Sequence, residues 1–205
     1  VTDHNSAENA SALMHAGATA GITIMPGMEV QTREEVHLIC LFDTLEQITH
    51  WQTRVHEHLP NALNREEVFG SQLIVNAEGE FLGFNERLLL TSTSFSVEDV
   101  IREVQSLNGI ALPAHVDRPS FSLLANLGFI PDGLDVPALE ISPRIRVDEA
   151  RTCFPQLRDW PLVINGDAHR LSEMCNRTLF KIAEPTVAEL NLAMRGREGR
   201  KMLVE

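Results

Sequence analysis

The segment IALPAHVDRPSFSLLANLGFIPDGLDVPALEISPRIRVDEARTCFPQLRDWPLVINGDAH, residues 110–169, decides the expected fold. Short apolar stretches alternate in it with helical patterns: strands at 110–113, 138–141 and 162–164, helices at 121–127 and 147–154. Buried strands separated by helices are typical of parallel sheets with right-handed crossovers. The segment therefore predicts an α/β fold in which a parallel sheet closes, or nearly closes, into a barrel.

The flanking sequence supplies further elements. Upstream we expect a helix at 7–20, strands at 21–30 and 36–42, a helix from Asp43 or Thr44 to 59, a hairpin at 72–76 and 80–84, and a helix at 97–107 capped by Ser96; downstream, a strand at 179–182 and a helix from Thr186 to 194. The link at 31–35 is short enough for its strands to pair. Residues 61–69 fit a loop over the barrel mouth or a helical turn, and 196–201 is expected to be a solvated basic tail. Without repeats or long linkers, residues 1–205 are expected to form a single domain.

Composition limits the functional classes. The 205 residues include 17 basic and 29 acidic ones, and the net charge of −12 makes extended nucleic acid an unlikely partner while permitting a small anionic substrate held by metals. No stretch has the eighteen or so uncharged apolar residues of a membrane span. The three cysteines show no paired spacing and predict buried, reduced thiols in a cytoplasmic protein. The oligomeric state is left open.

Candidate ligands fall at the expected strand ends, which a barrel gathers around one mouth. His4 follows a presumed incoming strand that ends at Val1, Glu29 ends the strand at 21–30, and His115 follows 110–113. Asp167 and His169 follow 162–164, and His37 could point across its hairpin toward Glu29. Any one of these histidines alone is more readily explained as a hydrogen-bonded structural residue. Together, imidazole and carboxylate groups at strand ends favour a site for zinc, manganese or iron.

Five motifs occur in a set order: Thr-Asp-His-Asn at 2–5, Pro-Gly-Met-Glu at 26–29, Glu-Val-His-Leu at 35–38, Pro-Ala-His at 113–115 and Gly-Asp-Ala-His at 166–169. In this the chain resembles the polymerase and histidinol phosphatase (PHP) superfamily over nearly its whole length. The resemblance implies a distorted seven-stranded β/α barrel, (β/α)7, with two or three divalent metals and phosphate-ester hydrolysis. It also implies that Glu29 bridges two metals, that His37 and His115 ligate one of them and Asp167 the other, and that His4 and His169 hold a third.

The sequence departs from the family at its beginning. The family opens with a His-x-His strand and a further histidine before the Thr-Asp-His motif, and residues 1–205 contain neither. We therefore expect a barrel lacking its first strand and part of its first helix. The metals of Asp167 and of the His4 and His169 pair would be short of ligands, whereas Glu29, His37 and His115 could form a more complete site.

The predicted function is hydrolysis of a phosphate monoester or diester of a small metabolite or nucleotide by a metal-activated water, with Asp167, His169 and Arg118 as catalytic residues. Arg118 could grip the substrate phosphate with its planar guanidinium or equally form a salt bridge to Asp117 or a neighbouring carboxylate. Asp3 is expected to orient a histidine from outside the metal shell. Two alternatives are kept: a noncatalytic metal-binding module, and an inactive fragment of a longer phosphoesterase.

Overall fold

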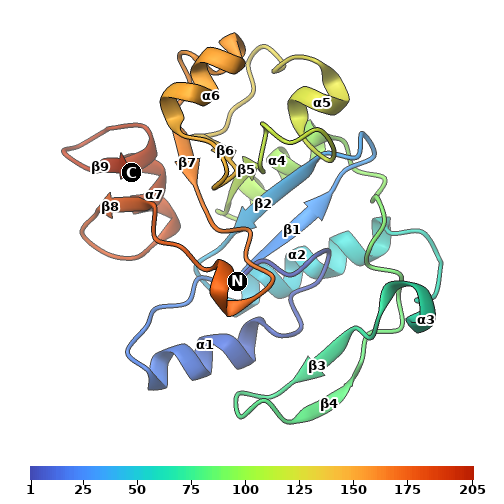
Figure 1. Ribbon diagram of the computed structural model, residues 1–205. Coiled ribbons are helices and arrows are strands. Elements are labelled where there is room, and N and C mark those ends of the chain that lie inside the picture. Colours follow the sequence, from blue (N-terminus) through green and yellow to red (C-terminus); the bar gives the residue numbers. More distant parts are fainter.

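The computed structural model describes residues 1–205 as a mixed α/β fold (Figure 1). Strands β1 (Gly27–Gln31), β2 (His37–Leu41) and β5 (Ile110–Pro113) form one sheet in the order β1-β2-β5, with both pairings antiparallel. Strands β6 (Leu139–Ile141) and β7 (Leu162–Ile164) pair in parallel. The backbone N–H of Val116 donates to the carbonyl of Glu140, which joins the end of β5 to β6.

The remaining elements surround these strands or extend from them. They are α1 (Ala10–Thr19), α2 (Leu45–His58), α3 (Glu66–Phe69), the hairpin β3 (Leu73–Val75) and β4 (Phe81–Phe84), α4 (Val97–Ser106), α5 (Leu123–Leu127), α6 (Val147–Cys153), α7 (Val187–Met194), and the antiparallel pair β8 (Thr178–Lys181) and β9 (Lys201–Val204). Short 3-10 turns lie at Pro155–Leu157 and Leu171–Glu173. In Figure 1 the β3–β4 hairpin projects away from the central strands.

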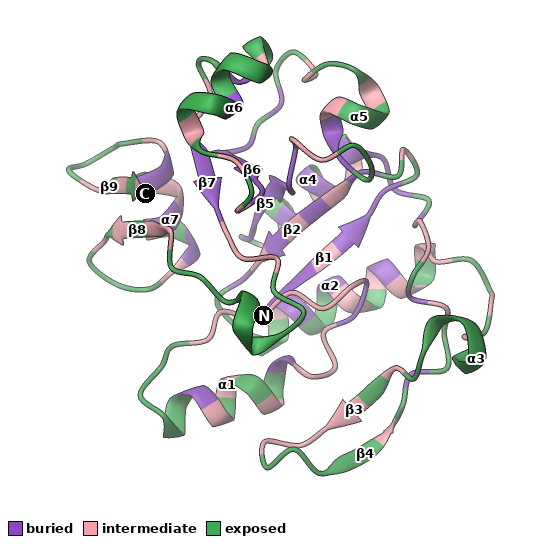
Figure 2. Cartoon of the chain, in the orientation of Figure 1, coloured by how far each residue is buried: buried purple, intermediate pink, exposed green.

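The core lies on both faces of the β1-β2-β5 sheet. Met28, Val30, Leu38 and Cys40 are fully buried and pack with side chains of α2 and α4, including Trp51. Because strand side chains alternate, the intervening residues face the other way. There Ile39 and Leu41 pack in a second apolar cluster with Leu112, Val163 and α7. Figure 2 shows the burial concentrated in the central strands.

Most of the expected elements are present, with local corrections. The helices α2 and α4 begin at capping boxes of Thr44 with Gln47 and of Ser96 with Asp99. Residues 61–69 contain the helical turn α3. Residues 21–26 form no strand, because the strand begins only after Pro26. A side chain on Gly27 would meet the Cys40 carbonyl at 2.6 Å, so the strand needs glycine at this close approach.

Two further expectations need correction. The basic run at 196–201 is not entirely a solvated tail, because Lys201 begins β9, which pairs with β8. Of the three cysteines only Cys40 is buried, whereas Cys153 and Cys175 are exposed. Burial raises the pKa of the Cys40 thiol far above its ordinary value, which makes it unreactive.

The closed barrel of seven strands is not confirmed. Among the named strands only β6 and β7 pair in parallel, and the hydrogen-bonded strands fall into separate sheets. The short turn after β1 explains part of the difference: it can join only antiparallel neighbours, because a parallel pair needs a crossover of a dozen or more residues. No helix has the length and apolar character needed to cross a membrane.

Candidate metal centre

The alternation of β1 and β2 brings Glu29 and His37 to one face of the sheet. Cross-strand pairing sets Gln31 opposite His37, and Glu29 lies two residues from Gln31 on the same face. This face carries Ile39 and Leu41 toward the other end of β2, so an apolar cluster lies beside the polar pair. The sheet register thus confirms that His37 reaches across the hairpin to Glu29.

Loops supply the other candidate ligands. His115 follows β5 and Asp167 follows β7, and both have positive φ angles, +33° and +44°. His4 forms a parallel bridge with Glu29, in which the Asn5 N–H donates to the Glu29 carbonyl at 2.8 Å. Positive φ angles like those of His115 and Asp167 are uncommon for residues other than glycine, and they cluster at functional sites.

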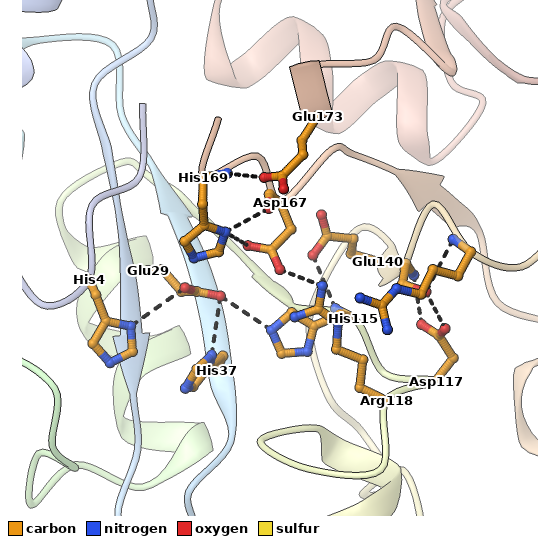
Figure 3. A network of polar contacts seen from close by, with 12 residues as sticks. His4, Glu29, His37, His115, Asp117, Arg118, Glu140, Asp167, His169 and Glu173 are labelled. Atoms are coloured by element: carbon orange, nitrogen blue, oxygen red, sulfur yellow. Dashed lines mark hydrogen bonds and ion pairs between the residues drawn. The ribbon is translucent and has the colours of Figure 1, made fainter. Parts of the chain in front are cut away.

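Three imidazoles surround the carboxylate of Glu29 (Figure 3). Nδ1 of His37 and Nε2 of His115 lie 3.2 and 3.3 Å from Oε1, and Nδ1 of His4 lies 3.5 Å from Oε2. The approach of His37 to Oε1 is outside hydrogen-bond geometry, so both of its ring nitrogens are buried without a hydrogen-bond partner. Nδ1 of His115 is likewise buried and unpartnered. One carboxylate therefore lies at the centre of a partly unsatisfied donor set.

The electrostatics of this cluster keep Glu29 and His37 in the forms that bind a metal. Burial alone would raise the pKa of the Glu29 carboxyl, but the close imidazoles of His115, His37 and His4 outweigh it and hold the pKa far below its ordinary value. Burial lowers the pKa of His37 and outweighs the opposing effect of Glu29. An ionised carboxylate beside a neutral imidazole is the state that binds a cation.

Asp167 and Arg118 face this cluster from the other side. Nη2 of Arg118 lies 2.5 Å from Oδ2 of Asp167, which is the salt bridge to a neighbouring carboxylate considered for Arg118. Asp117 is not its partner, because the Asp117 carboxylate accepts from the N–H and hydroxyl of Ser142, each at 2.6 Å. The structure therefore joins Arg118 to a candidate ligand.

His169 and Asp3 are less engaged with the cluster. The side chain of His169 is 77% exposed, and its Nδ1 lies 3.0 Å from the Asp167 carbonyl and 4.0 Å from Oδ1 of Asp167. The carboxylate of Asp3 accepts from the side-chain amide of Asn9 at 3.4 Å, and it makes no hydrogen bond to a histidine. The orienting role of Asp3 stays a prediction.

A cavity of about 730 Å³ opens in front of these groups. Its walls include all six candidate ligands and Arg118, together with Asp3, Gln31, Leu90 and Phe121. Residues from 4 to 169 thus converge on one space, as the positions at the strand ends predicted. The volume is in the range of small-molecule sites.

Two residues that support the site were missed in the sequence. Asn5 is fully buried, donates to the carbonyls of Leu89 and Thr91 at 2.8 Å, and accepts from the Gln31 N–H at 3.2 Å. Its place directly after His4 in the motif at 2–5 was a usable signal. The side-chain amide of Asn5 therefore ties the His4 segment to β1.

Glu140 supports the candidate metal site on the side of His115. It is 2% exposed, and its Oε2 accepts from the backbone N–H of His115 at 3.0 Å. Burial raises the pKa of the Glu140 carboxyl to about 7, against the lowering effect of the His115 contact. A single acid within the apolar strand Ala-Leu-Glu-Ile at 138–141 was the sequence signal.

The donor set fits a divalent cation. Ligand atoms of His4, Glu29 and His37 all lie within 4.8 Å of one another, close enough to share one ion. Buried ring nitrogens without partners carry a desolvation cost that coordination would remove. Imidazole with carboxylate suits several first-row metals, so the donors do not select one.

Comparisons with known proteins agree on the fold. No protein-family model matches the sequence, and no curated protein matches it. Among solved structures, the chain is similar to the lesion-specific endonuclease PfuEndoQ from Pyrococcus furiosus, with a TM-score of 0.57 and 22% identity over 86% of this chain and 40% of that one. It is also similar to endonuclease Q in complex with a 27-mer duplex carrying an abasic lesion at the active site, with a TM-score of 0.58 and 22% identity over 85% of this chain and 40% of that one.

A third similar structure is a putative metal-dependent phosphoesterase from Bifidobacterium adolescentis, with a TM-score of 0.50 and 16% identity over 82% of this chain and 76% of that one. At these identities the likeness concerns the fold, and the chain spans only 40% of the endonuclease chains. The chain thus shares its fold with these three structures.

Proposed function

We propose that the chain is a metal-dependent phosphoesterase that hydrolyses a phosphate monoester or diester of a small metabolite or nucleotide. The observation that carries the proposal is the cluster around Glu29, where three imidazoles meet one ionised carboxylate beside the Arg118 and Asp167 pair. Imidazoles, carboxylates and a guanidinium around one open cavity are the groups that cation-assisted phosphoryl transfer needs.

The ligand assignment is the one that the resemblance to the PHP superfamily implies. Glu29 would bridge two cations. His37 and His115, which lie beside its Oε1, would ligate the first cation, and Asp167 would ligate the second. His4, on the Oε2 side, and the exposed His169 would hold a third. When bound, zinc, manganese or iron ions lower the pKa of a water to about 7 and neutralise charge on phosphoryl oxygens.

The chain's own residues would bind and orient the substrate. Arg118 presents donors to the cavity, and the phosphate of a substrate would compete with Asp167 for them because both offer paired oxygens. Release from Arg118 would leave the Asp167 carboxylate free to bind a cation. Arg118, Asp167 and His169 are therefore our candidates for the catalytic residues.

The finer architecture belongs to the same proposal. Residues 1–205 would form a single distorted (β/α)7 barrel domain, and the parallel bridge of His4 to Glu29 supports a strand position on that side of β1. His4 and Glu29 would then be neighbours at the barrel mouth.

The ester could also belong to nucleic acid. One structural neighbour is endonuclease Q in complex with a lesion-containing duplex, which favours a phosphodiester of DNA as a second candidate substrate. The net charge of −12 opposes this, because an acidic surface repels the phosphate backbone. We therefore place the small ester first.

The test combines metal content with turnover. Purified protein is loaded with zinc, manganese or iron, its metal content is measured by mass spectrometry, and hydrolysis of para-nitrophenyl phosphate, bis(para-nitrophenyl) phosphate and an abasic-site DNA duplex is followed. Asp167→Ala should lower both metal content and turnover, whereas His50→Ala, an exposed histidine of α2, should change neither. Retained metal without hydrolysis of any ester would refute the enzyme and leave a noncatalytic metal-binding module.

A further inference from the structure

Phe121 is an unusual residue in the wall of the cavity. It lies between β5 and α5, its φ angle is +53°, and its side chain lines the cavity while remaining 42% exposed. A large aromatic residue at positive φ is a genuine outlier, because the side chain crowds its own backbone. The surrounding structure must hold it in place.

Hydrogen bonds from two directions fix this conformation. The carbonyl of Phe121 accepts from the backbone N–H of His37 at 3.1 Å, which ties the loop to the first residue of β2. The hydroxyl of Ser122 donates to the Arg118 carbonyl at 2.7 Å and accepts from the Ala125 N–H, which caps α5. The segment between Arg118 and α5 is therefore tied to β2 and to its own helix cap, which holds the backbone of Phe121 in this conformation.

Only part of the Phe121 ring is covered. It stacks on the imidazole of His37 with ring centroids 5.0 Å apart and 19° between the planes. The rest of the ring borders a cavity whose walls are mostly polar, and another apolar residue of those walls, Leu90, is 50% exposed. An apolar ring thus faces the space in front of the candidate metal ligands, beside the phosphate-binding candidate Arg118.

We propose that Phe121 is a specificity-determining residue that stacks with a planar aromatic ring in the alcohol part of the substrate. The inference rests on the proposed function and deepens it, because it names a phosphate ester whose alcohol part carries an aromatic ring, either a nucleotide or an aryl phosphate. With the phosphate at Arg118 and the metal ligands, the attached group lies against the walls of the same cavity. A planar ring gains stacking there, whereas the hydroxyls of a sugar would lose hydrogen bonds to water against an apolar ring.

The test compares adenosine 5′-monophosphate with ribose 5-phosphate, which share the same leaving oxygen and differ by the base. Phe121→Leu keeps an apolar cover on His37 but removes the planar ring. It should lower kcat/KM for the nucleotide by about 10-fold, as expected for the loss of one base–aromatic stack, and leave ribose 5-phosphate nearly unchanged. Phe121→Trp should restore the nucleotide, and phenyl phosphate distinguishes an aryl ester from a nucleobase. An equal loss for all esters would overturn the proposal and reduce Phe121 to a shield for His37.

Binding measurements separate this inference from the proposed function. If the metal-loaded wild type hydrolyses no ester, the hydrolase proposal fails, and calorimetry then measures the affinities of the same two ligands. We then expect wild type to bind the nucleotide more tightly than ribose 5-phosphate. Phe121→Leu should weaken binding of the nucleotide about 10-fold and leave the affinity for Zn²⁺ alone unchanged. Equal affinities of wild type for the two ligands, or a fall in Zn²⁺ affinity that accounts for the whole effect, would overturn it.

Discussion

Replacing Asn5 with alanine should destabilise the protein more than any surface substitution. The variant loses two hydrogen bonds to the carbonyls of Leu89 and Thr91 and one from the N–H of Gln31, and Asn5 itself is fully buried. At roughly 1 kcal/mol for each hydrogen bond, this amounts to about 3 kcal/mol of unfolding free energy. The positive φ of +50° adds about 1 kcal/mol, because asparagine tolerates that region and alanine does not.

Asn108 provides a matched control, since its φ is +58° but its side chain is exposed and makes no hydrogen bond. Asn108→Ala should therefore cost only the conformational part, about 1 kcal/mol. Urea unfolding followed by the fluorescence of Trp51 and Trp160 gives both free energies. A difference of less than about 0.5 kcal/mol between the two variants, within the scatter of ordinary surface substitutions, would refute the role of the Asn5 amide.

Two further predictions concern a helix cap and a supporting carboxylate. Ser96→Ala should lower unfolding free energy by about 1 kcal/mol. Hydrogen bonds from Ser96, with Arg102 contributing, lower the pKa of Asp99 to about 2 from an ordinary 3.8. The stabilisation by ionised Asp99 is therefore present above pH 4 and is lost as the pH falls through 2. Asp99→Asn should flatten that part of the curve of stability against pH, and an unchanged curve would contradict the cap. Glu140→Ala should weaken Zn²⁺ binding by about 10-fold or more in calorimetry, because the backbone N–H of His115 loses its acceptor. Glu140→Gln keeps an oxygen at that place and should bind Zn²⁺ nearly as well as wild type. Equal Zn²⁺ affinities of the alanine variant and wild type would contradict the supporting role of Glu140.

Local signals predicted the secondary structure well. Ser96 caps its helix as expected, Thr44 is the cap of the two considered for α2, and the strands at 110–113 and 162–164 have the expected bounds. These features depend on neighbours in sequence, which is why they were readable. Strands joined by short links pair as expected, at 27–41 and in the hairpin at 73–84. The pairing of strands distant in sequence was not readable, because the alternation of elements does not state which edges meet, and only β6 and β7 pair in parallel.

The sequence predicted where the candidate ligands lie, but it did not predict the residues that hold them in place. Glu29, His37 and His115 converge as predicted, although Glu29 lies within β1 and does not end it. Local signals mark Asn5 and Glu140 as unusual residues, but their roles depend on hydrogen bonds to backbone groups distant in sequence, which those signals do not specify. Pairing of Arg118 with Asp167 likewise required the loops after β5 and β7 to be placed side by side.

Anomalous diffraction from crystals grown with Zn²⁺ or Mn²⁺ tests most directly whether these side chains form a cation site. We predict a metal-specific peak within coordination distance of Glu29, His37 and His115, roughly 2.0–2.2 Å for zinc, and its loss in Glu29→Gln. Occupied metal sites only elsewhere on the surface, with the nitrogens of His37 still lacking a partner, would contradict the metal centre and the phosphoesterase proposal with it.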